Sequence, residues 1–460
     1  MYDIGANLRL LTWNIRGLND CRKIRKMSAY LHRHKIDLAL IQETHLSPNN
    51  VDTLQKIMRG TCHMACFTSH ARGVLLWIRR GSNVKFKEVQ TDPNGRFLIA
   101  HCHVDALEMI IVGVYGPNYE TPQFYTELYG RLHKYGDTPQ VWGGDFNCIL
   151  DVDRDRSNNT PRRASAASRT LLTFMDQDNL VDLRRHLYPE SAGFTHYSSL
   201  HDTHTRIDFW LMSRCLIPQV VHCDHFARTY SDHSPVLLEI NLPLSKPAPF
   251  AWRFPPYSLL DRVFREEVSQ AIDEFFTLNI GSVAKFSTVW EAFKVYIRGV
   301  TISKHAGVLR SLRMRLTRLE KEIKELEFTH SQTGNTSLLI DIKTKIDKFH
   351  NTAQDEVKHL GKYAMARAYG EGDRPGVTLA SLMRRERNAD MIIGVRDTEG
   401  KLLTSSAALT NRFHQYYTEL YSSCPTSANE LVDEYLSQIT MRWLTNEHRE
   451  WLMAPLSPAE

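Results

Sequence analysis

The chain has 460 residues, more than a single hydrophobic core usually serves, so two or three domains are expected. Hydrophobic residues make up 42% and charged residues 24%, as in ordinary globular proteins, and no segment reaches the roughly 18 apolar residues of a membrane span. The first residues lack the basic and apolar regions of a secretory signal. We therefore expect a soluble protein without a membrane partner, in a reducing compartment. A net charge of +5 permits nucleic-acid binding without requiring it.

The eight cysteines are scattered and include no CxxC pair, so a disulfide framework is not expected. Cys62, His63 and Cys66, together with residues 101–103 (His-Cys-His), could suggest a zinc site. Their spacings match no zinc finger or ribbon. Alternation along β-strands explains them better.

Residues 8–242 alternate short β-type runs with amphipathic helices and turns. The predicted strands are 8–15, 36–42, 73–78, 96–104, 109–115, 139–144, 206–212 and 235–242. Helical spacing of apolar residues occurs between them, at Ile24, Met27 and Leu31, at Phe124, Leu128 and Leu132, and at Leu171, Leu172 and Met175. These patterns predict an α/β domain, rich in sheet and flanked by helices.

Five prolines between Pro243 and Pro256 predict a linker over 243–257, because proline removes a donor and restricts its predecessor. Residues 258–370 are expected to be helical, with two apolar stripes that predict an antiparallel hairpin around a turn in THSQTGNTS (329–337). The interleaved Lys, Arg and Glu are expected to form a solvated face. In 371–460 the DTEG turn at 397–400 predicts a β-hairpin, followed by helix.

Polar residues follow the apolar runs of the first domain at six places. They are Asn14 in TWNIRGLN, Glu43 in LIQETH, Tyr115 in VYGPN, Asp145 and Asn147 in GGDFN, Asp208 in RIDFW, and Asp232 with His233 in SDHSP. A buried strand tolerates no unpaired carboxylate, so strand ends that meet at one edge would collect a cation or a phosphate. Carboxylates and amides favour a hard ion such as Mg²⁺, with Mn²⁺ as an alternative. Each residue taken alone could instead be a turn residue, a cap or a surface acid.

Taken together, the order and spacing of these motifs resemble the endonuclease/exonuclease/phosphatase superfamily, which includes apurinic/apyrimidinic endonucleases, inositol polyphosphate phosphatases and sphingomyelinases. The resemblance implies a four-layer α/β sandwich, with two β-sheets packed face to face and flanked by helices. It also implies that Glu43 and Asn14 hold the metal, with Asp232 near it.

The same resemblance implies the catalytic roles. Asp145 would activate water, Asn147 and Tyr115 would contact the phosphate, and His233, held by Asp208, would polarise the scissile phosphate. The glycines of GGDFN are expected to let the backbone turn and approach the substrate closely.

Among the branches of the superfamily, the chain resembles LINE-type (non-LTR) retrotransposon endonucleases, including the region that follows the endonuclease. The resemblance implies a Mg²⁺-dependent DNA endonuclease that nicks target DNA and leaves a 3′-hydroxyl primer for target-primed reverse transcription. An apurinic/apyrimidinic repair endonuclease is the alternative. No polymerase motif of the Tyr-x-Asp-Asp type occurs, so the polymerase itself is expected to be absent. Double-stranded DNA is the expected partner, with element RNA at the helical half left open, and the location is nuclear and/or cytoplasmic.

The segment GFTHYSSLHDTHTRID (193–208) reads as two polar β-runs around a tip near 198–202, ending at Asp208. The resemblance implies that such a hairpin enters the minor groove beside the cut; a plain surface hairpin is the alternative. The expected DNA contacts are Thr195, Ser198, Ser199, His201 and Arg206.

Overall fold

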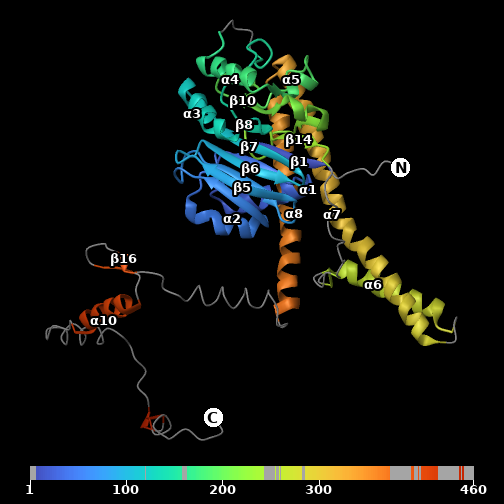
Figure 1. Cartoon of the computed structure of the whole chain (residues 1–460). Coiled ribbons are helices and arrows are strands. Elements are labelled where there is room, and N and C mark those ends of the chain that lie inside the picture. The colour runs from blue at the N-terminus through green and yellow to red at the C-terminus, as the bar shows by residue number, and fades with distance from the viewer. Residues whose placement is uncertain are drawn as a thin grey trace. The chain divides into compact units, whose positions relative to one another are not determined.

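The computed structural model describes residues 7–119, 121–157, 163–242, 254, 258–259, 261–281, 285–372, 395–397, 402–403, 406–422, 445–446 and 448–449. The chain divides into two compact units, Met1–Gly370 and Glu371–Glu460 (Figure 1). Within the described residues, no helix has the length and apolar character needed to cross a membrane.

Two six-stranded mixed sheets form the centre of the first unit (Figure 1). The first has the strand order β13 (Val220–His225), β14 (Val236–Ile240), β1 (Leu8–Asn14), β2 (Leu38–Gln42), β4 (Val74–Arg79), β3 (Gly60–Ala65). The second has the order β5 (Val84–Thr91), β6 (Phe97–Val104), β7 (Leu107–Tyr115), β8 (Gln140–Asp145), β12 (Asp208–Ser213), β9 (Leu180–Asp182). All eight predicted strands are present, and β3, β5, β9 and β13 are additional.

Side chains alternate between the two faces of each strand, and the apolar ones form three layers of core. Side chains on the inner faces of the two sheets, such as Leu10 and Ile111, share one core. The outer face of the first sheet packs against α1 (Cys21–Arg33) and α2 (Val51–Met58), and that of the second against α3 (Pro122–Leu132) and α4 (Ala166–Gln177). Asp20 and Ser165 cap α1 and α4 by accepting backbone N–H bonds. The predicted four-layer sandwich is confirmed.

The predicted helical hairpin is also present, as α7 (Phe286–Thr333) and α8 (Leu338–Gly372). The shorter helix α6 (Arg262–Asn279) packs on α7, with the Phe275 ring 5.0 Å from that of Tyr296. The apolar stripes of the hairpin, including Leu316 and Phe349, join the same core as α1. The helical pair therefore covers the outer face of the first sheet alongside α1.

The charged residues between these stripes were expected to be solvated, and for several of them this is wrong. The Arg33 guanidinium of α1 binds Glu320 at 2.8 Å and Glu356 at 2.9 Å, with all three side chains at most 8% exposed. Lys324 of α7 binds Asp224 of β13 at 2.7 Å. The opposite charge of Arg33 allows Glu320 and Glu356 to be buried, whereas Lys324 stays 36% exposed. Of the predicted linker 243–257, only Phe254 is described, and the domain boundaries remain predictions.

The second unit contains the predicted β-hairpin, in which β15 (Val395–Arg396) pairs antiparallel with β16 (Leu402–Leu403), and helix α10 (Ser406–Ser422). The intervening turn lies outside the described residues, as do 373–394 and the last residues PLSPAE. Among the described cysteines none is disulfide-bonded. Cys62 and Cys102 face apolar cores from β3 and β6, as strand alternation predicts.

Candidate active site

Three of the predicted catalytic residues form a single row across the second sheet. Strand register pairs Tyr115 of β7 with Asp145 of β8, and Asp145 with Asp208 of β12. Paired residues point to the same face of a sheet. Here that face is the inner one, since Val141 and Trp210, an even number of positions away on the same strands, lie in the core between the sheets. The row lies where this core ends.

The first sheet supplies the groups opposite this row. Asn14 ends β1, and Glu43 follows the neighbouring parallel strand β2. The Asn14 amide donates to Glu43 Oε1 and to Asp145 Oδ2, both at 2.9 Å. Asn14 therefore joins the carboxylates of the two sheets. Glu43 has a φ of 50°, a left-handed conformation that costs a residue with a Cβ about 1 kcal/mol or more.

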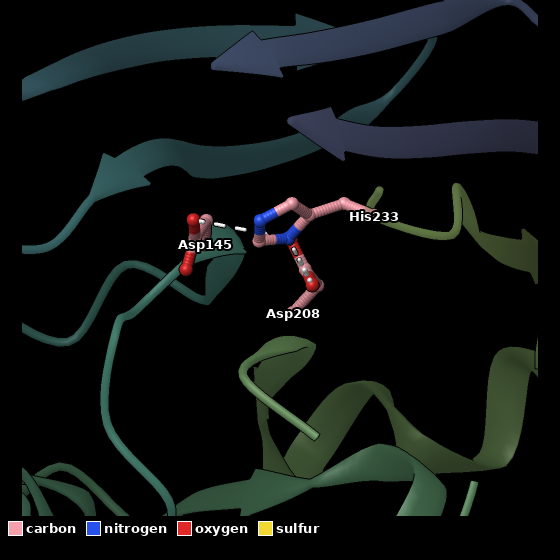
Figure 2. Close-up of side chains that lie close together, drawn as sticks. All are labelled: Asp145, Asp208 and His233. Atoms are coloured by element: carbon pink, nitrogen blue, oxygen red, sulfur yellow. Dashed lines mark hydrogen bonds and ion pairs between the residues drawn. The ribbon is translucent and has the colours of Figure 1, made fainter. Parts of the chain in front are cut away.

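His233 precedes β14 and faces both carboxylates of the second sheet (Figure 2). Its Nδ1 donates to Asp208 Oδ2 at 2.9 Å and lies 3.9 Å from Asp145 Oδ2. The hydroxyl of Thr195 donates to the same Asp208 oxygen at 2.7 Å. Thr195 thus holds the Asp208 carboxylate, and this carboxylate in turn orients the His233 imidazole.

Burial and mutual charge shift the pKa values of this cluster in opposite directions. Burial, followed by the charge of Asp208, raises the pKa of Asp145 to about 7, against the opposing effects of His233 and Asn14. Burial alone would lower the pKa of His233, but the carboxylates of Asp208 and Asp145 outweigh it and raise it to about 10. Asp145 is therefore suited to take up a proton near neutral pH, and His233 carries a positive charge.

The donor set fits a hard divalent cation. Asp145, Asp208 and His233 each bring one N or O atom within 4.8 Å of one another. Because the His233 ring is positively charged and donates to Asp208, the carboxylates are the groups of this cluster that would bind a cation. The Glu43 side chain, linked to Asp145 by Asn14, is 21% exposed, and its Oε2 lies 3.6 Å from His45 Nε2. Carboxylate oxygens reachable from solvent are the ligands that Mg²⁺ or Mn²⁺ takes. The Asn14 amide oxygen itself accepts a bond from the Arg16 backbone N–H, so in this arrangement the nitrogen faces the carboxylates.

Asn147 and Asp232 lie at the rim of the cluster. Asn147 has a φ of 49°, its backbone N–H donates to Asp145 Oδ1 at 2.9 Å, and its amide donates to Asn118 Oδ1. Tyr115 donates to the same oxygen of Asn118 at 3.2 Å, so Asn118 links two predicted phosphate contacts. Asp232, predicted to lie near the metal, forms an ion pair with Arg16 at 2.6 Å.

The expected role of the GGDFN glycines is wrong. Gly143 and Gly144 lie within the extended, buried strand β8, and neither has a positive φ. A Cβ on Gly143 would lie 2.4 Å from Trp210 Cζ3, and one on Gly144 would lie 2.0 Å from the Val114 carbonyl oxygen. Both glycines therefore permit close packing within the sheet, and Asp145 faces the site because it is the last residue of the strand.

The predicted hairpin is present, with β10 (His196–Ser198) antiparallel to β11 (Thr203–Thr205). Ser199 and His201 are exposed at the tip and Ser198 is half-buried, so all three can reach a ligand. Leu200 between them is 85% exposed.

Two of the residues expected to contact DNA are buried instead. Thr195 is 1% exposed and its hydroxyl donates to Asp208, so it fixes the position of that carboxylate. Arg206 is also 1% exposed, because its guanidinium is enclosed by Asp155 at 2.7 Å and Asp182 at 2.6 Å. This ion-paired cluster fixes the base of the hairpin, and the DNA contacts expected of Thr195 and Arg206 remain predictions. No local sequence pattern predicts the bond between Thr195 and Asp208 or the ion pairs of Arg206.

Comparison with known proteins agrees with this site. Residues 11–233 match the Endonuclease/Exonuclease/phosphatase family. The chain is similar to the Transposon TX1 uncharacterized 149 kDa protein of Xenopus laevis, at 23% identity over 91% of this chain. It spans about a third (32%) of that protein's length. It is also similar to a DNA-(apurinic or apyrimidinic site) endonuclease of Dictyostelium discoideum, at 22% identity over 51% of this chain and 71% of the relative.

Among solved structures, AP endonuclease LMAP from Leishmania major is 18% identical, with a TM-score of 0.45 over 52% of this chain and 88% of that one. The family match covers every strand-end residue from Asn14 to His233, and these are the residues that the two sheets bring together. Residues 11–233 thus carry the similarity to the Endonuclease/Exonuclease/phosphatase family, and the strand-end residues of this segment meet at one end of the two sheets.

Proposed function

We propose that this protein is a Mg²⁺-dependent DNA endonuclease of a LINE-type retrotransposon. It nicks double-stranded target DNA and leaves a 3′-hydroxyl that primes reverse transcription. The observation that carries the proposal is the row formed by Tyr115, Asp145 and Asp208, facing Asn14 and His233 at one end of the sandwich. Similarity to a transposon protein along 91% of the chain supports the retrotransposon assignment.

The chemistry follows from the position of each group. Glu43, with Asn14 beside it, would hold the metal, which when bound would stabilise the negative charge of the phosphate and of the 3′ oxygen that leaves as the P–O3′ bond breaks. Asp145 accepts a proton from the attacking water, since its pKa of about 7 matches the working pH. His233, positively charged against Asp208, donates a hydrogen bond to the scissile phosphate as negative charge develops. Asn147 and Tyr115 orient the phosphate from the rim.

A plasmid assay tests the proposal. The protein is incubated with supercoiled plasmid with and without Mg²⁺, and the nicked product is offered to a DNA polymerase with labelled nucleotides. We expect nicking only with the metal, and extension from the nicks without prior treatment. Nicks that need a phosphatase before they prime synthesis would contradict the predicted 3′-hydroxyl end.

The second candidate is a repair endonuclease that acts at abasic sites, favoured by the similarity to the Dictyostelium enzyme. The two functions differ in substrate. A repair enzyme cuts a duplex with one abasic site far faster than the matched intact duplex, whereas the proposed enzyme cuts both at similar rates.

Duplex DNA is the partner proposed for the exposed hairpin tip. A hairpin tip inserted into the minor groove would respond to the width of the groove and to the deformability of the DNA. Cuts should therefore favour flexible pyrimidine–purine steps. Replacing 198–202 by a short Gly-Ser turn should redistribute the nicks while leaving the metal requirement unchanged.

Element RNA is a further proposed partner, for the helical half. We also propose that the protein acts on chromosomal DNA in the nucleus after synthesis in the cytoplasm.

A further inference from the structure

One turn of α7 contacts two segments of the nuclease domain that lie far away in the sequence. Glu327 Oε1 accepts from Arg228 Nε at 2.8 Å, and His330 Nδ1 shares a hydrogen bond of 2.9 Å with His204 Nε2 of β11. Glu327 is 8% exposed, and His330 and His204 are 2% and 5% exposed. These are buried polar contacts, which are costly unless both partners are in place.

Tyr197 of β10 connects the two contacts. Its ring centroid lies 4.7 Å from that of His204 and 5.4 Å from that of His330, the latter at an edge-on angle of 87°. The Arg228 guanidinium lies over the same ring, 5.2 Å from its centroid. Both strands of the hairpin therefore pack against the Glu327–His330 turn.

The other side of the hairpin is joined to the catalytic residues. Besides the Thr195 bond to Asp208, the Ser234 N–H donates to the Thr195 carbonyl at 2.7 Å. His196 forms an isolated antiparallel bridge with His233, and their rings lie 4.5 Å apart. A shift of the hairpin is therefore transmitted to the orientation of His233 and Asp208.

His330 has no second polar contact that would explain its burial. Its Nε2 has no hydrogen-bond partner among the described residues, which leaves the bond to His204 as the polar interaction of the ring. Burial lowers the pKa of His204 to about 4, so this imidazole is neutral at physiological pH and can share a single N–H···N bond. The pair has a specific geometry that a generic apolar contact between a helix and a hairpin would not require.

We propose that Glu327 and His330 are positioning residues for cleavage-site selection: from α7 they fix the β10–β11 hairpin against the catalytic centre, and so determine where duplex DNA is cut. This inference rests on the proposed DNA-nicking function. It makes α7 a part of the nuclease's DNA-reading apparatus, although no residue of α7 carries a nuclease motif. The partner is a duplex whose groove receives the hairpin tip with its exposed Leu200.

The test uses the full chain and a defined duplex in Mg²⁺. His330→Ala removes the bond to His204, His330→Asn keeps an amide near the position of Nδ1, and Glu327→Gln removes the charge that holds Arg228 with little change of shape. Thr329→Ala is the matched control, because Thr329 is exposed and bonds to the carbonyl of Glu325 within its own helix. Nick positions are sequenced, kcat and KM are measured separately, and thermal unfolding reports the fold.

We expect His330→Ala to lower the preference for the strongest site over the others by about fivefold, the effect of one buried hydrogen bond. KM should rise while kcat changes less, His330→Asn should recover most of the preference, and Thr329→Ala should match the wild type. Glu327→Gln should redistribute nicks in the same direction as His330→Ala. If His330→Ala fails to fold, Glu327→Gln provides the same readout.

An unchanged nick distribution in folded Glu327→Gln or His330→Ala protein overturns the inference, even if the unfolding temperature falls, because the contact would then only dock the helix. A uniform loss of kcat at every site also overturns it. If instead the wild-type protein nicks no duplex at all, it is the proposed function that fails.

Discussion

Replacing Asp208 by Asn tests the proposed coupling between Asp208 and His233. The carboxylate is buried, and it accepts bonds from His233 Nδ1 at 2.9 Å and from Thr195 at 2.7 Å. Asn has the same shape but no charge, so the charge-assisted bond to the imidazolium is lost. Such a bond contributes about 1.5–3 kcal/mol, which corresponds to a loss of about 10- to 10²-fold in nicking rate.

The pH profile should change as well as the rate. Burial lowers the pKa of His233 and the neighbouring carboxylates raise it, so removing one carboxylate must lower this pKa. The charged imidazolium is then lost at a lower pH, and the alkaline limb of the rate profile moves to lower pH.

The assay is the initial rate of plasmid nicking in Mg²⁺ across a pH series, with Asp37→Asn as the control. Asp37 is a buried carboxylate that accepts a bond from the Arg9 backbone N–H and pairs with Arg79, so its replacement should reduce thermal stability without moving the pH profile. If Asp208→Asn nicks within about threefold of the wild-type rate, against the loss expected from a charged hydrogen bond, and its pH profile is unchanged, the assigned pairing is wrong.

Three further outcomes are expected. Glu43→Gln should weaken Mg²⁺ binding at least about tenfold and recover nicking at high Mg²⁺, whereas Asp145→Asn should stay inactive at every Mg²⁺ concentration; identical behaviour would contradict their separate roles. Gly144→Ala should lower the free energy of unfolding in urea by about 1–3 kcal/mol, because its Cβ would lie 2.0 Å from the Val114 carbonyl, while Gly130→Ala, with nothing within 4 Å, should not. Burial alone would raise the pKa of Glu320, but His34 and Arg33 lower it below 4.5. The charged Glu320 carboxylate therefore stabilises the fold above pH 4.5, and this contribution is lost as the pH falls through the lowered pKa. Below pH 4.5 the backbone amides of α7 should exchange hydrogen faster relative to their intrinsic rates. Glu320→Gln should remove this pH dependence.

The sequence by itself determined the sandwich and which residues meet in the candidate site. Both depend on local patterns: apolar residues that alternate with period two, and polar residues immediately after such runs. Asn14 and Asp145 each end a strand of this kind and Asp208 begins one, so their convergence at one end of two packed sheets could be predicted before any contact was known. The two stripes of α7 and α8 likewise predicted a hairpin from their spacing alone.

Tertiary structure alone decided which polar residues are buried and by what partner. Arg206 reads as a basic residue beside a catalytic strand, yet its partner Asp155 comes 51 positions earlier and encloses it. Position 143 needs a glycine because a Cβ there would collide with the ring of Trp210 on the adjacent strand. His330 meets His204 across 126 residues of sequence, and Arg33 meets Glu356 across 323. Sequence periodicity specifies the face on which a side chain lies, whereas the partner depends on how distant elements pack, and no local pattern records that.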